Sequence, residues 1–247
     1  MTSKIEQAKQ MLHAIETGKT DSIMANVSPD EYIQHNLQFG NGRDAILVSI
    51  PQLQTYQPKL EFLRTIEEGN YVAVQTHYTF SDQPVNGFDV FRFDGDKIVE
   101  HWDNLEQVTG NSLNGHTPFG GSNLDLSANT ENTKTVANAF HKHILINKEF
   151  DQLNQYVSEN IINHISDVAD GSEAYQQMLT NNSNYQAAHF EVSQGDFSLL
   201  TSEGHENDQH VVYYDLVRIE NNQVAEIWRT KEVVLPKDQW ANDNGKF

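Results

Sequence analysis

One predicted β-hairpin, spanning residues 88–103, holds the side chains best suited to proton transfer. The Asp94-Gly95 pair in its middle is typical of a tight turn between two strands. If the turn comprises the three residues 94–96, Asp89 lies opposite His101. A carboxylate beside an imidazole on an apolar wall is a workable acid/base pair, because the apolar surroundings move both pKa values toward neutrality. Four side chains share one face of the hairpin on this register: Asp89, Phe91, His101 and Asp103.

The opposite face of the same hairpin would carry Arg92, Glu100 and Trp102. A turn of two residues would break this grouping. We favour the turn of three because it collects Arg92 with Glu100 and leaves the acid–imidazole pair together. That pair has two interpretations, a catalytic acid/base pair or a buried structural pair.

Two further histidines are candidates for the same pocket. His35 precedes a predicted helix and either closes over the cavity or is an ordinary core or helix-terminal residue. His77 alternates along the central strand, so its direction depends on the register of that strand. Together with His101 they could make a zinc site, but their long and unequal spacing is unspecific. We therefore expect no metal and no other cofactor.

The chain is an internal duplication, because residues 88–102 can be laid over residues 214–228 without a gap. Upstream, His35 aligns with His164 and Gly42 with Gly171, at an offset three residues larger. Four residues of the hairpin are identical in the two copies: Asp89/Asp215, Arg92/Arg218, Glu100/Glu226 and Trp102/Trp228.

Each copy also ends on a similar tail, so the second copy is expected to be complete. The shared tail residues are Asn111, Asn114, Gly115 and Phe119 in the first copy, and Asn242, Asn244, Gly245 and Phe247 in the second. Between the copies the sequence is small, polar and aperiodic, as in a linker. We predict domains over 1–120 and 130–247, with a linker over 121–129.

The elements that position the hairpin follow from periodicity. In the first copy a helical pattern covers residues 5–15 and stops at Gly18, and further helices are expected over 21–27 and 43–54, where Pro51 kinks or ends the last one. The period then changes to two, which predicts antiparallel strands over 59–67, 71–80, 87–93 and 97–107. Helices followed by a meander indicate an α+β fold, with the helices on one face of a curved sheet that encloses a pocket.

The pocket chemistry differs between the copies. Ile227 replaces His101, Arg229 replaces Asp103, and Glu203 replaces His77. Arg229 is expected on the same face as Asp215, where a salt bridge would keep that carboxylate ionised and occupied. We therefore expect any proton chemistry in the first copy, with a structural, regulatory or differently specific second copy.

Composition limits the partners. The chain has 247 residues and a formal net charge of −19, which repels phosphate backbones and anionic lipid, so neither nucleic acid nor membrane is expected. The absence of cysteine excludes disulfides and cysteine-based chemistry. Residues 1–20 do not read as a signal peptide, and no segment approaches the roughly 20 apolar residues of a membrane span, so we expect a cytoplasmic protein.

Residues 32–36, Gly42, the hairpin 88–103 and the tail from Asn114 to Phe119 together resemble SnoaL-like proteins of the nuclear-transport-factor-2-like superfamily. The resemblance implies cone-shaped domains, each with about three helices on a strongly bent antiparallel sheet. It also implies cofactor-free cyclases of the aldol-condensation type, although relatives include isomerases, dehydratases and non-catalytic binding modules. Residues are carried over as catalytic (His35, Asp89, His101, Asp103) or ligand-binding (Tyr32, His77, Phe91).

Two hypotheses follow for the function. The first is a cofactor-free lyase or isomerase that acts on a small apolar carbonyl compound, in which Asp89 or Asp103 removes a proton and His101 with His35 polarises the oxygen. The second is a non-catalytic module for ligand binding or dimerisation. The tandem layout further suggests that the two copies pair sheet to sheet within one chain as a pseudo-dimer, and a homodimer of the chain is a further possibility.

Overall fold

The computed structural model describes residues 2–110 and 112–247, so Asn111 of the first tail lies outside the described residues. The chain divides into two compact units: unit 1 comprises Met1–Gln107 and Val234–Phe247, and unit 2 comprises Val108–Val233. This grouping differs from the predicted boundaries, because the tail after each copy belongs to the unit of the other copy. The sheet-to-sheet pairing of the copies and the homodimer stay predictions.

Unit 1 begins with the predicted helices, α1 (Lys4–Thr17), α2 (Asp21–Asn26) and α3 (Arg43–Gln54). The side chain of Ser3 accepts a hydrogen bond from the backbone N–H of Glu6 and caps the start of α1. Gly18 ends this helix in the left-handed region, at a φ of 70°, which glycine adopts without a steric cost. Helix α3 continues to Gln54 although Pro51 lies inside it.

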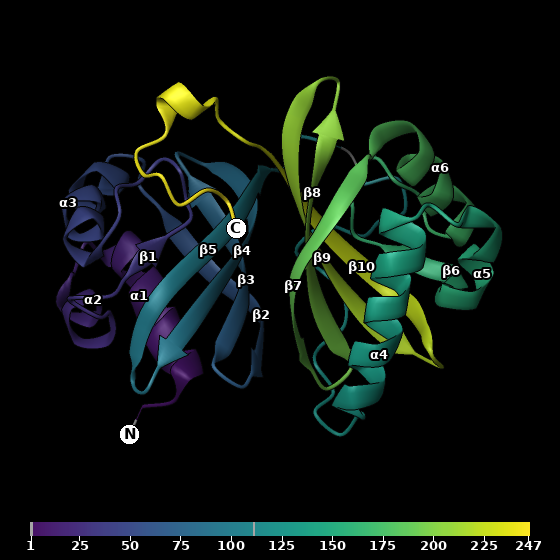
Figure 1. Cartoon of the computed structure of the whole chain (residues 1–247), viewed down its shortest axis with the longest axis horizontal. Helices are drawn as coiled ribbons and strands as arrows, with labels where there is room; N and C mark the ends of the chain where they lie inside the picture. Colours follow the sequence, from purple (N-terminus) through teal and green to yellow (C-terminus); the bar gives the residue numbers. More distant parts are fainter. Residues whose placement is uncertain (1, 111) are drawn as a thin grey trace. The chain divides into compact units, whose positions relative to one another are not determined.

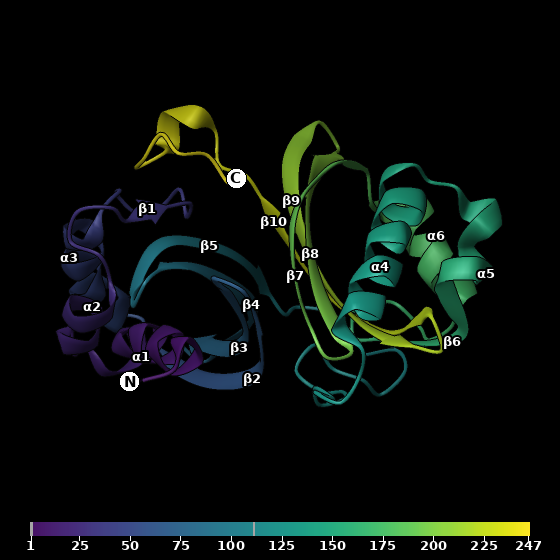
Figure 2. The same cartoon turned by 60° about the horizontal axis from the view of Figure 1, so that its bottom comes forward.

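The sheet of unit 1 has five strands in the order β1-β5-β4-β3-β2. Its strands are β1 (Ile33–Gln34), β2 (Lys59–Glu68), β3 (Tyr71–Phe80), β4 (Gln83–Asp94) and β5 (Lys97–Gln107). The four long strands form the predicted antiparallel meander, but β1 pairs with β5 in parallel, so the sheet is mixed. Figure 2 shows the sheet curving, with the three helices on one side of it.

Unit 2 repeats this plan, with the sheet order β6-β10-β9-β8-β7 and a parallel pair of β6 and β10 (Figure 1). Its helical elements are α4 (Thr130–Phe140), the π-helical turn His141–Ile146, the short 3-10 turn Phe150–Gln152, α5 (Leu153–Tyr156) and α6 (Ser172–Asn182). Its strands are β6 (Val157–Asn163), β7 (Tyr185–Gln194), β8 (Phe197–Glu206), β9 (Gln209–Glu220) and β10 (Gln223–Val233).

The aligned glycines Gly42 and Gly171 confirm the larger offset upstream. Each immediately precedes the third helix of its copy, α3 or α6, at a φ of 88° or 96°. Glycine tolerates this positive φ, whereas other residues rarely adopt it. Among the described residues, no helix has both the length and the apolar character needed to cross a membrane.

The β4–β5 hairpin corrects the predicted register while keeping the predicted faces. Its turn has two residues rather than three, since Asp94 pairs with Lys97. A bulge follows, so that Arg92 pairs with Glu100 and Asp89 pairs with Asp103 instead of His101. The bulge compensates for the shorter turn, because the extra residue restores the alternation that a two-residue turn alone would have inverted.

The helices cover the face of the unit 1 sheet that carries Val72, Val74, Phe91 and Phe93, which join apolar side chains of α1, α2 and α3 in one core. We call this helix-covered side the inner face and the other side the outer face. Because side chains alternate along a strand, Asp89 lies on the inner face with Phe91. Arg92 and Trp102 lie on the outer face.

Candidate functional site

Three ionisable side chains of unit 1 meet on its inner face. Asp89 of β4 and His101 and Asp103 of β5 are 3%, 6% and 5% exposed. His101 Nε2 lies 3.1 Å from Asp89 Oδ1, and the imidazole stacks on Phe91 with 4.7 Å between ring centroids. The structure thus brings together four of the predicted site residues.

Asp89 has a second partner in Tyr78, whose hydroxyl donates to Asp89 Oδ2 over 2.6 Å. A Cβ atom at Gly87 would lie 2.7 Å from the Tyr78 ring, so glycine makes room for this tyrosine. Burial raises the pKa of Asp89, although the hydrogen bond from His101 acts in the opposite direction. A carboxyl group with a raised pKa holds a proton more readily, and is therefore a stronger base, than an ordinary carboxylate.

Gln34 of β1 fixes the orientation of His101. Its Oε1 accepts a hydrogen bond from the backbone N–H of Asn36 and lies 3.0 Å from His101 Nδ1. This oxygen has no proton to give, so Nδ1 is the donor and Nε2 faces Asp89. Nε2 and Asp89 Oδ1 are therefore placed to pass a proton from one to the other.

Asp103 is held by different groups. Asn36 Nδ2 donates to Asp103 Oδ2 over 2.7 Å. Lys246, which belongs to the C-terminal segment, places its Nζ 3.5 Å from Asp103 Oδ1 and donates to the backbone oxygen of the same residue over 2.9 Å. The Lys246 side chain is 2% exposed, so this ion pair is almost fully enclosed.

Tyr32 lies at the same site. It is buried, and its hydroxyl accepts a 3.4 Å hydrogen bond from Gln34 Nε2. Burial raises the pKa of Tyr32, and the charges of Asp103 and Asp89 raise it further. The phenol therefore keeps its proton and can act as a hydrogen-bond donor.

His35 does not join this cluster, contrary to the predicted role. Its Nε2 lies 2.9 Å from Glu100 Oε1 and its Nδ1 lies 2.9 Å from the backbone oxygen of Gly245. The ring stacks on Trp102 at 4.8 Å, and Arg92 Nε donates to Glu100 Oε2 over 2.6 Å. Because β1 runs parallel to β5, Gln34 points to the inner face and the next residue, His35, to the outer face.

His77 also points away from the cluster. It alternates with Tyr78 along β3, and its Nδ1 lies 3.6 Å from Glu61 Oε2 of β2. The predicted role of His77 in ligand binding is therefore not supported by its position.

The three ionisable groups could also be considered as metal ligands, because Asp89, His101 and Asp103 each offer an atom within 4.8 Å of the others. Their surroundings fit this use poorly. Tyr78 already donates to one carboxylate, and the Lys246 ammonium lies beside the other. A cation among them would displace these bonds and repel the ammonium. The donor set fits proton transfer better.

The corresponding place in unit 2 has a carboxylate without an imidazole. Asp215 accepts a hydrogen bond from Tyr185 over 2.8 Å. Its register partner is Arg229, as predicted for a shared face, and Ile227 stands where unit 1 has His101. Arg229 donates to Ser183 over 2.8 Å. No imidazole among the described residues of β10 can exchange a proton with Asp215.

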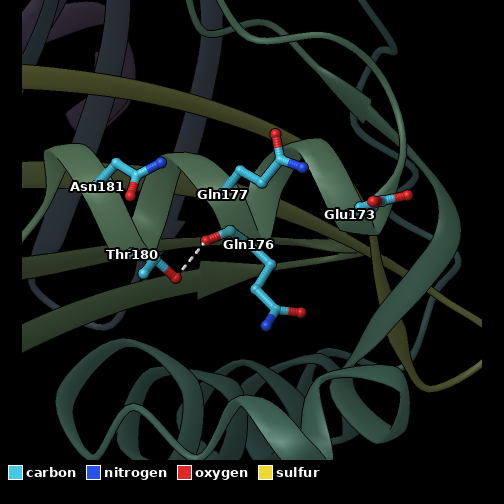
Figure 3. Close-up of a pocket in the computed structure, with 5 residues that line it drawn as sticks. All are labelled: Glu173, Gln176, Gln177, Thr180 and Asn181. Carbon is cyan, nitrogen blue, oxygen red and sulfur yellow. Dashed lines mark hydrogen bonds between the residues drawn. The ribbon is translucent and has the colours of Figure 1, made fainter.

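A surface hollow of about 370 Å³ lies along α6 in unit 2 (Figure 3). Its walls carry amide and hydroxyl groups and one carboxylate, spaced along a single side of the helix: Glu173, Gln176, Gln177, Thr180 and Asn181. None of the predicted site residues contributes to it, and its groups offer no acid/base pair.

The sequence prediction missed four residues of the inner-face cluster: Gln34, Asn36, Tyr78 and Lys246. Tyr78 could have been found from its alternation with Val72 and Val74. Gln34 and Asn36 flank His35 in the motif that was recognised. Lys246 carried no signal, because its segment was predicted as part of the second domain, whereas residues 234–247 group with unit 1.

Comparisons with known proteins bear on the same region. Residues 8–101 match the model of the SnoaL-like domain, and no curated protein matches the chain. A solved structure of a candidate ketosteroid isomerase from Kribbella flavida is 11% identical, with a TM-score of 0.40, over 44% of this chain and 84% of its own. A candidate polyketide cyclase from Bacillus cereus is 18% identical, with a TM-score of 0.37, over 40% and 72%.

A cystatin-fold protein from Novosphingobium aromaticivorans is 19% identical, with a TM-score of 0.37, over 41% of this chain and 97% of its own. The family match spans helices α1–α3 and the strands up to the middle of β5. Unit 2 repeats the same α+β plan. Residues 8–101 are therefore similar to a SnoaL-like domain, and the sheet of unit 2 repeats the strand order of the sheet in unit 1.

Proposed function

We propose that unit 1 is a cofactor-free acid/base catalyst, a lyase or isomerase of the aldol-condensation or polyketide-cyclase type that acts on a small apolar carbonyl compound. The observation that supports this most is the buried Asp89–His101 pair, in which His101 Nε2 lies 3.1 Å from Asp89 Oδ1. The family match is consistent with the proposal but does not identify a reaction.

In the proposed reaction, the Asp89–His101 pair starts without a proton between the two side chains, and the Asp89 carboxylate takes one from the carbon next to the substrate carbonyl. His101 shares that proton through Nε2, while Gln34 keeps the ring in place through Nδ1. The Tyr32 hydroxyl donates a hydrogen bond to the carbonyl oxygen, where negative charge develops. His35, which the sequence suggested for this task, faces the other side of the sheet.

Access to the site must involve movement, because Asp89 is only 3% exposed. Asp103, its register partner, is covered by the C-terminal segment through Lys246. We therefore expect the substrate to enter when that segment lifts, and the reaction to proceed once it has closed and excluded water.

Two assays test the proposal without a known substrate. The first follows deuterium exchange at the α-carbon of a panel of small apolar ketones and aldehydes. The second follows ring opening of nitrobenzisoxazole, which reports a desolvated carboxylate base. We expect Asp89→Asn to lower the rate by about 100-fold or more.

Asp215→Asn is the matched control, because it removes the aligned carboxylate of unit 2. It should leave both rates unchanged. If Asp89→Asn and Asp215→Asn were both as active as the unaltered chain, the assignment of the base to Asp89 would be wrong.

The second candidate is a non-catalytic ligand-binding module. The near-complete enclosure of the cluster favours it, since Asp89, His101 and Asp103 are each at most 6% exposed. Native mass spectrometry of the purified chain should then reveal a retained small molecule that is recovered chemically unchanged after incubation. Conversion of that molecule would favour the enzyme.

A further inference from the structure

Two carboxylates and one imidazole face each other in unit 1, which raises the question of which acid carries the transferable proton. Asp89 and Asp103 are register partners on β4 and β5. Two buried carboxylates this close cannot easily both be charged, because each disfavours ionisation of the other. Their different neighbours must divide the roles.

Lys246 stands beside only one of the two acids. Its Nζ lies 3.5 Å from Asp103 Oδ1, and Asn36 donates to the other oxygen over 2.7 Å. Asp89 instead has the Tyr78 hydroxyl and the His101 ring. A cation and an amide donor favour the charged carboxylate, whereas an imidazole can exchange a proton with its partner.

The position of Lys246 is fixed by a series of hydrogen bonds along the C-terminal segment, which runs beside β1 in Figures 1 and 2. The backbone N–H of Ala241 donates to Leu37 over 2.8 Å, and Asn242 Nδ2 donates to the backbone oxygens of Asn36 and Phe39 over 2.9 Å. Asn244 Nδ2 donates to the backbone oxygen of Gln34 over 2.8 Å. These bonds deliver the next basic side chain, Lys246, to Asp103.

The tail of the first copy is held on unit 2 in the same manner, but it brings no cation to the inner face. Asn114 Nδ2 donates to the backbone oxygen of Asn163 over 2.9 Å, as Asn244 does to Gln34. His116 follows at the place of Lys246 and pairs with Asp170 at 3.3 Å. In unit 2 the positive group opposite Asp215 is Arg229, from the strand itself.

From this contrast we infer that Lys246 is a positioning residue of the unit 1 site. Its ammonium keeps Asp103 charged, and Asp89 and His101 are thereby left to share the transferable proton. The inner-face site of the first copy is thus complete only when the segment that follows the second copy is docked. The inference rests on the proposed function for its catalytic meaning, but its electrostatic part can be measured without turnover.

The ionisable groups around Asp103 come from every element packed against it. They are Tyr32 from the segment before β1, Tyr78 from β3, Asp89 from β4, His101 from β5 and Lys246 from the C-terminal segment. Lys246 is the one permanent cation in this set. Removing it therefore makes proton uptake by the cluster easier, so uptake begins at a higher pH.

The test is a pH titration of the full chain, followed through the ring nitrogen NMR signals of His101. We expect Lys246→Gln, which can still donate to the Asp103 backbone oxygen, to raise the midpoint of proton uptake by about one pH unit or more. Lys246→Met should do the same, and Lys246→Arg should restore the original midpoint. Lys237→Met is the matched control, because that lysine lies in the same segment over the Trp240 ring.

An unchanged midpoint in both Lys246→Gln and Lys246→Met would overturn the inference, as would an equal shift in Lys237→Met. A loss of structure in Lys246→Met alone does not decide the matter, because Lys246→Gln and Lys246→Arg still separate charge from packing. A shifted midpoint in a chain that shows no turnover would leave the role of Lys246 standing and refute the proposed function. A pH–rate profile that moves with the midpoint would support both.

Discussion

The outer faces of units 1 and 2 carry the same residue types in similar contacts, whereas the side chains on their inner faces differ. On the outer face, His164 repeats the contacts of His35: it stacks on Trp228 at 4.6 Å, lies 2.7 Å from Glu226, and meets the backbone oxygen of Thr117 at 2.8 Å. Arg218 completes the group by donating to Glu226 over 2.8 Å. The outer face, which is similar in the two units, therefore binds the tail that follows the other copy. The inner face, which differs between them, carries the proposed chemistry in unit 1.

The inner faces also differ in which strand carries a tyrosine and which carries a glycine. In unit 1 the Tyr78 ring lies over Gly87, and the two aligned positions of unit 2 hold Gly204 and Tyr213. The bulky and the small residue have thus changed strands. Asp89 accepts its phenolic hydrogen bond from β3, while Asp215 accepts one from Tyr185 of β7. Each carboxylate thus keeps a phenolic partner, but Ile227 stands in unit 2 where unit 1 has the imidazole of His101.

The largest expected effect comes from making the inner face of unit 1 resemble that of unit 2. His101→Ile removes the partner of Asp89 and leaves a carboxylate without a proton relay. We expect the rates of deuterium exchange and of nitrobenzisoxazole opening to fall by about 100-fold or more. His77→Ile, on the opposite face, is the control. Equal losses of rate in the two variants would contradict the assignment of the reaction to the inner face.

The next effect concerns the outer-face groups and should be larger in unit 2. Glu226 has a 2% exposed side chain, against 14% for Glu100. Glu226→Gln leaves His164 and Arg218 without their charged acceptor, and should lower the free energy of unfolding by roughly 3 kcal/mol. Glu100→Gln should cost less. Urea unfolding curves of both variants measure the difference, and a larger loss in Glu100→Gln would contradict the comparison.

Low pH should reduce the contribution of Glu226 to the stability of the fold. Burial would raise the pKa of Glu226, but hydrogen bonds from His164, Ser122 and Arg218 lower it from 4.5 to about 2. The pKa is lower in the folded than in the unfolded chain, so the stabilisation is complete above about 4.5 and is lost as the pH falls toward 2. The difference in stability between the unaltered chain and Glu226→Gln should shrink over this range.

The smallest expected effect is a gain in thermal stability. Because burial raises the pKa of Asp89, ionisation of this residue costs the folded state free energy; the cost grows as the pH rises from the ordinary pKa of about 3.8 to the higher folded-state pKa, and it is constant above that. Asp89→Asn removes that cost while its amide can still bond to Tyr78 and His101. We expect a slightly higher melting temperature at neutral and alkaline pH, together with the loss of activity. Asp94→Asn, in the exposed turn, is the control, and an equal gain there would contradict the argument.

Much of the fold follows from local patterns in the sequence. The periods of 3.6 and two predict the helices and long strands, because burial on one face imposes those repeats. The grouping of Asp89 with His101 and Asp103 also follows from alternation, even though the turn length was wrong. A β-bulge has no pattern of its own, so the compensating register shift could not be predicted.

Other features depend on contacts between distant segments. The parallel pairing of β1 with β5 decides that His35 faces away from the cluster, and two residues of strand give too short a pattern to show this. The contact of each tail with the other copy could not be predicted from the sequence, for a different reason. Both tails have similar sequences and make similar bonds, so the sequence does not indicate which copy each one contacts.

The exchanged tails also impose an order on synthesis. The strands of the unit 1 sheet are all present once residue 107 has left the ribosome, and domains generally fold as they emerge. Yet His35, Asn36 and Asp103 meet their partners Gly245, Asn242 and Lys246 only after the whole of unit 2 has been made. The first unit to form is therefore the last to be finished, since its proposed site is complete only after residue 246 has been made.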